Sequence, residues 1–95
     1  MARSPSHGTR LPIPRRLRAL RKVEGYETAK EFAAKLGITP NRYGNVEAGS
    51  SLSIELALMI VKLCPDVSTD WLYTGNPRFL TVEYRRKIDQ ALDQL

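Results

Sequence analysis

Apolar residues recur along the chain at spacings of three and four, and this period predicts α-helices throughout. No stretch alternates apolar and polar residues in the way that a half-buried strand does. Glycine, proline and Ser/Thr capping residues divide the pattern into short segments joined by tight turns. Six helices are predicted in order, over residues 14–24, 28–36, 39–48, 53–64, 68–74 and 81–95. The predicted fold class is therefore all-α.

The turn between the second and third predicted helices is only three residues long and runs from Gly37 to Thr39. Before it, Thr28 and Glu31 have the spacing of a capping box, and Gly37 suits the left-handed end of a helix. After it, Thr39 is a good N-cap and Pro40 a good first helical residue. So short a connection forces two helices to cross steeply, which is typical of a helix-turn-helix unit.

The predicted helix 39–48 has one apolar and one polar face. Tyr43 and Val46 lie three residues apart and are predicted to face the core. The residues left on the outer side, near the start of the helix, are Pro40, Asn41, Arg42, Gly44 and Asn45. A recognition helix presents polar groups to the major groove of DNA in this way.

Two further helices carry long apolar patterns. Glu55 and Lys62 are the only charged residues of the predicted helix 53–64, so that helix is expected to be buried on most sides. In the last predicted helix, four apolar residues recur at spacings of four, four and three, namely Tyr84, Ile88, Leu92 and Leu95. This stripe either forms a dimer interface or folds back onto the core of its own chain, and spacing alone favours neither.

The net charge of +5 is unevenly distributed along the chain. Residues 1–22 hold seven basic residues and no acidic one, whereas residues 23–95 hold ten acidic and eight basic residues. Residues 1–13 also lack a helical period and contain proline, serine and glycine, so they are predicted to be a flexible basic arm. Such an arm either meets a polyanion or is a solvated tail.

Composition excludes several classes of protein. A chain of 95 residues has room for one domain, and its longest apolar run, residues 56–61, is far shorter than the ~20 residues of a membrane-spanning helix. With one cysteine, Cys64, and one histidine, His7, we expect no disulfide, no metal site, no cofactor and no catalytic Cys-His pair. These features fit a cytoplasmic protein without enzymatic activity.

Five motifs follow one another between residues 14 and 75: Leu17-Arg-Ala-Leu-Arg21 before Gly25, Phe32-Ala-Ala-Lys-Leu-Gly-Ile-Thr39, Tyr43-x-x-Val46-Glu47-x-Gly49, Leu52-Ser-Ile54, and Val67-Ser-Thr-Asp-Trp71-Leu72-Tyr-Thr-Gly75. Their order and spacing resemble the lambda repressor and Cro-type helix-turn-helix family, also called the XRE family, of phage and bacterial regulators. The resemblance implies a compact five-helix DNA-binding domain over residues 14–76, preceded by the arm (1–13) and followed by a C-terminal helix (77–95).

The resemblance also implies roles for individual residues. Asn41 and Asn45 would read base edges, because an asparagine amide can bond to adenine with two hydrogen bonds. The other residues implied to contact DNA are Thr28, Thr39, Pro40, Arg42, Gly44 and Arg18, with Arg15 and Arg16 near the backbone. Arg42 would either read guanine or bind a phosphate, and its direction on the helix favours the phosphate. Arg21 and Glu47 would form an ion pair that holds the recognition helix, unless they are two independent surface charges.

Several of these assignments have alternatives. Gly44 marks either a close approach of DNA or relief of crowding within the chain, and Thr28 is either a phosphate contact or a purely structural cap. Ala29 and Pro40 stand where the family often has glutamine, which leaves fewer side chains to read DNA.

Two functions follow as hypotheses. The first is a dimeric, sequence-specific regulator of transcription, most simply a repressor, bound to double-stranded DNA in the nucleoid. The second is a protein-interaction or antitoxin-like module, in which the predicted helices 53–64 and 81–95 bind a partner and DNA binding is secondary.

Overall fold

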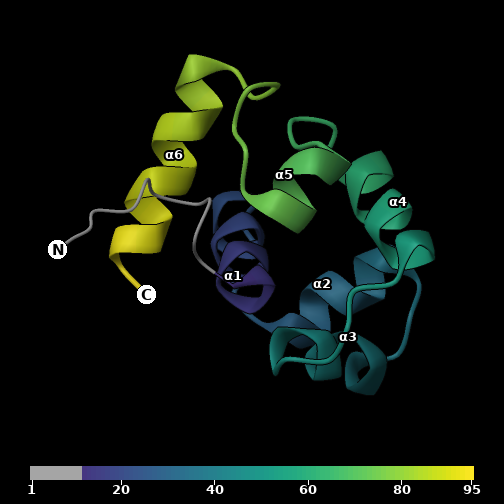
Figure 1. Ribbon diagram of the computed structural model, residues 1–95. Helices are drawn as coiled ribbons and strands as arrows, with labels where there is room; N and C mark the ends of the chain where they lie inside the picture. The colour runs from purple at the N-terminus through teal and green to yellow at the C-terminus, as the bar shows by residue number, and fades with distance from the viewer. Residues whose placement is uncertain (1–11) are drawn as a thin grey trace, which may run out of the picture.

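Six α-helices and the turns between them make up residues 12–95, the part of the chain that the computed structural model describes (Figure 1). The helices are α1 (Ile13–Val23), α2 (Ala29–Leu36), α3 (Pro40–Glu47), α4 (Ile54–Leu63), α5 (Thr69–Thr74) and α6 (Val82–Asp93). No strand occurs within this range. The prediction of an all-α helix-turn-helix fold with a further C-terminal helix is confirmed.

Side-chain caps explain why the chain breaks into such short helices. Each of the five helices from α2 to α6 is preceded by a serine or threonine whose hydroxyl accepts the amide three residues ahead. These N-caps are Thr28, Thr39, Ser53, Ser68 and Thr81. Every cap satisfies one of the amides that a helix start leaves unpaired, so the helix boundaries are encoded locally.

The turn between α2 and α3 has the predicted helix-turn-helix geometry. Gly37 ends α2 with φ of 81°, a left-handed conformation that glycine adopts at little cost. Ala33 is fully buried one turn earlier, and the rings of Phe32 and Tyr43 meet edge to face with their centroids 5.2 Å apart. A small residue in α2 and an aromatic contact across the crossing therefore fix α3 against α2.

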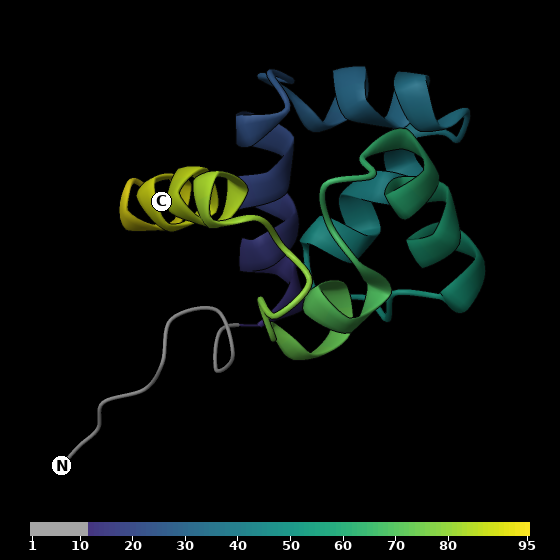
Figure 2. The ribbon, with the colours of Figure 1, turned by 90° about the horizontal axis from the view of Figure 1, so that it is seen from above.

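Helix α1 lies at the centre of the fold. It packs against α3 and α5 on one side and against α6 on the other, and Figure 2 shows α6 beside α1, away from α4. Leu17, Ala19 and Leu20 are accordingly fully buried. The helix begins at Ile13 after Pro12, so residues 12 and 13 belong to the domain and not to the predicted arm. The rest of that arm, residues 1–11, lies outside the described residues.

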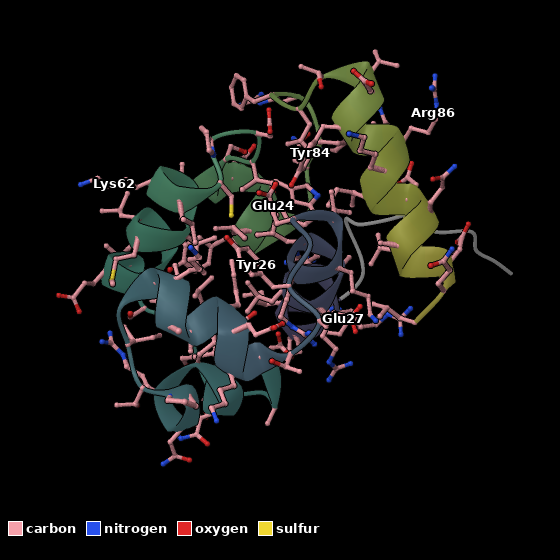
Figure 3. The ribbon with its side chains drawn as sticks, turned by 180° about the vertical axis from the view of Figure 1, so that it is seen from behind. Glu24, Tyr26, Glu27, Lys62, Tyr84 and Arg86 are labelled. Atoms are coloured by element: carbon pink, nitrogen blue, oxygen red, sulfur yellow. The ribbon has the colours of Figure 1, made fainter. Side chains whose placement is uncertain are left out.

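Helix α6 belongs to the core of the chain, which corrects one of the two interpretations of its apolar stripe. Tyr84, Ile88 and Leu92 are buried, and Leu95 is half-buried against the same cluster. The Tyr84 hydroxyl donates a hydrogen bond of 2.5 Å to the Glu24 carboxylate at the end of α1 (Figure 3). Tyr84, Ile88 and Leu92 are therefore not free to form a dimer interface, because they are buried where α6 packs on α1.

Helix α4 is less buried than its sequence indicates. Leu56, Ala57 and Ile60 face the core, yet Ile54 is 62% exposed and Leu58 57% exposed. The expectation of burial on most sides is wrong because, among the helices, α4 packs mainly against α2 and α5. Its opposite side faces outward although it carries apolar residues.

A buried cluster of polar groups joins α1 to α3. The Arg21 Nε donates to Glu47 Oε2 over 2.8 Å, and the Tyr43 hydroxyl donates to the same oxygen over 2.6 Å. Arg21 also donates through Nη1 to the main-chain carbonyls of Tyr26 and Glu27. Burial raises the pKa of the Tyr43 phenol well above its usual value, and the neighbouring Glu47 carboxylate raises it further. The phenol therefore stays a hydrogen-bond donor to Glu47.

The Arg21–Glu47 pair yields a prediction about stability. Replacing either residue alone (Arg21→Met or Glu47→Gln) leaves the other charge buried, and should lower the free energy of unfolding by about 3 kcal/mol. The double variant should lose less than either single variant, because no unpaired charge remains. Urea unfolding of the four proteins measures this coupling, and additive losses would show that the two residues act independently.

Candidate nucleic-acid interface

The first turn and a half of α3 forms an exposed polar surface. Tyr43, Val46 and Glu47 point inward and are buried, so the rest of the helix is turned outward at the lower edge of the molecule in Figure 1. The exposed residues are Thr39, Pro40, Asn41, Arg42 and Asn45. The structure thus brings together the residues predicted to form a recognition surface on this helix.

Asn41 and Asn45 lie one turn apart on this surface. Both are exposed, and neither side chain makes a hydrogen bond to any other residue of the described chain. A primary amide offers two N–H donors and one carbonyl acceptor. The two side chains therefore present unused donors and acceptors on one face of an exposed helix.

Thr39 and Pro40 fix the start of this surface. The Thr39 hydroxyl accepts the Arg42 amide at 3.1 Å, and Pro40 occupies the first helical position, where no amide donor is needed. Both residues are exposed. Within the described chain, both residues serve to start the helix. Because Thr39 is exposed, its hydroxyl proton can still donate a hydrogen bond outward.

Arg42 is paired with a residue outside the predicted recognition surface. Its Nη2 lies 3.2 Å from Glu55 Oε1 at the start of α4, and both side chains are largely exposed. An exposed pair of this kind contributes only about 0–1 kcal/mol, so the guanidinium can exchange this carboxylate for another anion. No local sequence pattern signals a pair thirteen residues apart between two helices.

Gly44 has open space around it. It is half-buried within α3, and a Cβ added there would meet no heavy atom within 4 Å. Relief of crowding inside the described chain therefore does not explain this glycine. Glycine destabilises a helix interior by about 0.5–1 kcal/mol relative to alanine, and no contact within the described chain accounts for that cost.

The start of α2 is occupied by the chain itself. Thr28 forms the predicted capping box: its hydroxyl accepts the Glu31 amide, and the Glu31 carboxylate accepts the amides of Glu27 and Thr28 at 2.9 and 3.2 Å. Ala29 is half-buried and packs against the core. The Glu31 carboxylate thus fills the position where an external anion would meet these amides.

The arginines of α1 hold other helices and do not form a free basic surface. Arg16 is buried and donates to the carbonyls of Leu72 and Tyr73 at the end of α5, and burial lowers its pKa. Arg15 donates to the Leu92 carbonyl in α6. Arg16 is therefore too buried for the expected contact with a DNA backbone, whereas for the half-buried Arg15 that contact stays a prediction.

Arg18 is also engaged within the chain. Its Nη2 donates to the main-chain carbonyl of Glu47 at the C-terminal end of α3, and its Nε lies 4.0 Å from the Glu47 carboxylate. The cation therefore stabilises the negative end of the helix dipole of α3. The structure places Arg18 at the opposite end of α3 from Pro40.

Other kinds of site find no support in the described part of the chain. No helix within residues 12–95 is long and apolar enough to cross a membrane. No three His, Cys, Asp or Glu side chains of that range come together in a way that could hold a metal ion. His7 lies outside the described residues.

Comparison with known proteins agrees with this geometry. A family model described as Helix-turn-helix matches residues 17–72, from the first turns of α1 into α5. No curated protein and no solved structure matches the chain. The family match covers more than half of the chain and contains the whole α2–turn–α3 unit. The protein therefore belongs to the lambda repressor and Cro-type (XRE) helix-turn-helix family.

Proposed function

We propose that this protein is a sequence-specific regulator of transcription that binds double-stranded DNA as a dimer and acts as a repressor. The observation that carries the proposal is the outer face of α3, where the amides of Asn41 and Asn45 are exposed and unbonded within the described chain. Membership of a family of DNA-binding regulators supports it. The place of action would be the nucleoid in the cytoplasm.

The proposed reading step uses the start of α3. With this helix in the major groove, the two asparagine amides meet base edges, where an amide can donate to and accept from one adenine. Gly44, on the same stretch of helix, lets the DNA come close because it has no side chain. Specificity therefore depends on neutral amides and on backbone proximity.

Arg42 is the residue proposed to bind the DNA phosphates. Its guanidinium would exchange the exposed Glu55 carboxylate for a phosphate oxygen, a replacement that keeps a charge-assisted hydrogen bond. Repression then needs only that the bound protein covers a promoter.

A protein-interaction module is the second candidate function. It is favoured by four exposed large apolar residues on the described surface, Ile54, Leu58, Phe79 and Val82. In that case a stoichiometric protein partner would occupy these residues, and DNA binding would be weak and indifferent to sequence.

Selection of bound duplexes from random DNA tests the proposal directly. A regulator of the proposed kind enriches a palindromic site with half-sites about 34 Å apart, one helical turn of DNA. Footprinting of the selected site at several salt concentrations then separates specific from non-specific binding. Enrichment of no sequence, with binding lost near physiological salt, would contradict the proposal and favour the interaction module.

The asparagines should determine sequence preference. Asn41→Ala and Asn45→Ala should each weaken binding to the selected site by about tenfold or more, since a good two-bond base contact contributes about 1–3 kcal/mol of discrimination. Binding to unrelated DNA should be unchanged. Gln90→Ala removes an exposed amide from α6 and serves as the matched control. Equal effects on selected and unrelated DNA would refute base reading by these residues.

Gly44→Ala should change stability and binding in opposite directions. Alanine fits the open space, so the free energy of unfolding should rise by about 0.5–1 kcal/mol. Affinity for the selected site should fall, because the added methyl group stands between α3 and the DNA. Urea unfolding and a binding titration measure the two effects, and unchanged affinity would show that DNA does not approach this residue.

The basic residues before α1 should affect the affinity for DNA without changing which DNA sequence the protein prefers. Deleting residues 1–11 removes Arg3 and Arg10. If both meet phosphates, the slope of log affinity against log salt should become shallower by about 0.9 for each phosphate that the shortened protein no longer neutralises. The preferred sequence should stay the same. An unchanged slope would show that these arginines do not touch DNA.

A further inference from the structure

The outer face of α4 is a feature of the described surface that the proposed reading of DNA leaves unexplained. Ile54 and Leu58 are one turn apart and 62% and 57% exposed, and Val61, one turn further on, is half-buried. Ile54 and Leu58 form an apolar stripe on the exposed side of α4, and Val61 continues it to the edge of the core, against which it packs. Neighbouring apolar residues left exposed on one helix face are a candidate surface for contact with another molecule.

The stripe is flanked by one charge of each sign. Glu55 and Lys62 are exposed on the same outward side, Glu55 near the start of α4 and Lys62 near its end. They lie seven residues apart, about 10 Å along the helix axis, so they are too far apart to pair within one chain. Lys62 extends from α4 away from the body of the protein (Figure 3), and it makes no ion pair with any residue from 12 to 95.

This arrangement is complementary to itself. If two copies pack α4 against α4 in antiparallel orientation about a two-fold axis opposite Leu58, each Glu55 lies against the other copy's Lys62. The two Leu58 side chains then meet at the axis, and each Ile54 packs near the far end of the other helix. A parallel pairing would instead put the same flank of the two helices on opposite sides of the pair, so that neither Glu55 nor Lys62 would meet an opposite charge. Charge therefore selects the antiparallel arrangement.

We propose that the outer face of α4 is the dimer interface of this protein, and that its occupant is a second copy of the chain. The inference rests on the proposed function for its biological role, because a two-fold dimer presents two α3 helices to two half-sites. Glu55 would lie both at the dimer interface and beside the outer face of α3, since one of its carboxylate oxygens already accepts a hydrogen bond from Arg42 of α3.

The interface is small. One helix face from each copy buries less than the ~800 Å² per partner of a standard stable complex, so the free dimer should dissociate readily. Bound to adjacent half-sites, two copies are held at high effective concentration, and a weak contact is then sufficient.

A cysteine placed on the predicted axis tests the geometry. Leu58→Cys should form a disulfide-linked dimer under mild oxidation, because residues that meet at a two-fold axis can approach within the roughly 7 Å between Cα atoms that a disulfide needs. Val82→Cys is the control, since Val82 is a more exposed apolar residue on α6, at 76%. The native Cys64 should not interfere: it is fully buried, and burial, with smaller effects of Glu24 and Asp66, raises its pKa to about 12. Faster linkage through position 82 than through position 58 would overturn the proposal.

A charge exchange tests the pairing itself. Glu55→Lys and Lys62→Glu each place like charges together twice in the symmetric dimer, so each should weaken self-association by about tenfold in sedimentation equilibrium. The exchanged double variant (E55K/K62E) should recover to within about threefold of the original protein, since the opposite charges meet again. Lys62→Glu leaves the Arg42–Glu55 pair intact, and circular dichroism checks that each variant folds. Losses that add in the double variant would overturn the proposal.

The two proposals fail in different ways. The protein could still enrich and bind palindromic sites, yet neither form the disulfide at position 58 nor recover self-association on charge exchange. That outcome would refute the α4 interface and leave DNA reading intact. A dimer that passes both tests and selects no DNA sequence would refute the regulator and leave the interface intact.

Discussion

The buried carboxylate of Glu47 is the interaction on which the rest of the structure depends. Helix α3 has only eight residues, and a helix this short is marginal by itself, so its position must come from tertiary contacts. Glu47 receives Arg21 from α1 and Tyr43 from its own helix, while Arg18 binds its main-chain carbonyl. The last turn of α3 is thereby anchored, and its first turn projects outward. The exposed polar surface at one end of α3 therefore depends on this polar anchor at the other end.

Helix α1 acts as the organising element through its arginines. Arg15, Arg16, Arg18 and Arg21 reach α6, α5 and α3 and end on carbonyl or carboxylate oxygens. Each arginine therefore connects α1 to another helix, and Arg16 and Arg21 do so through more than one nitrogen of the planar guanidinium. The basic character of this segment is largely a structural property, and net charge alone overstates the part of it available to a polyanion.

The local features of the fold could be predicted from the sequence, because caps and turns depend on neighbouring residues. Thr28, Thr39 and Gly37 define their helix ends as expected. Which neighbouring helix covers the apolar side of α4 or of α6 could not be predicted in this way. Periodicity shows that a helix has an apolar side, but not which neighbour covers it, and here α1 covers α6 while the Ile54 side of α4 stays open. Likewise, the pair Arg42–Glu55 and the burial of Arg16 arise from packing between distant segments.

The packing of α6 on α1 also determines how late in synthesis the fold can be completed. Tyr84 bonds to Glu24, and Arg15 to the carbonyl of Leu92, across sixty and seventy-seven residues of chain. One side of α1 therefore stays uncovered on the ribosome until α6 has emerged. Contacts of such long separation form late, because the intervening chain must be ordered first. A nascent chain stalled before residue 84 would expose the apolar side of α1, which is the surface that chaperones and proteases detect.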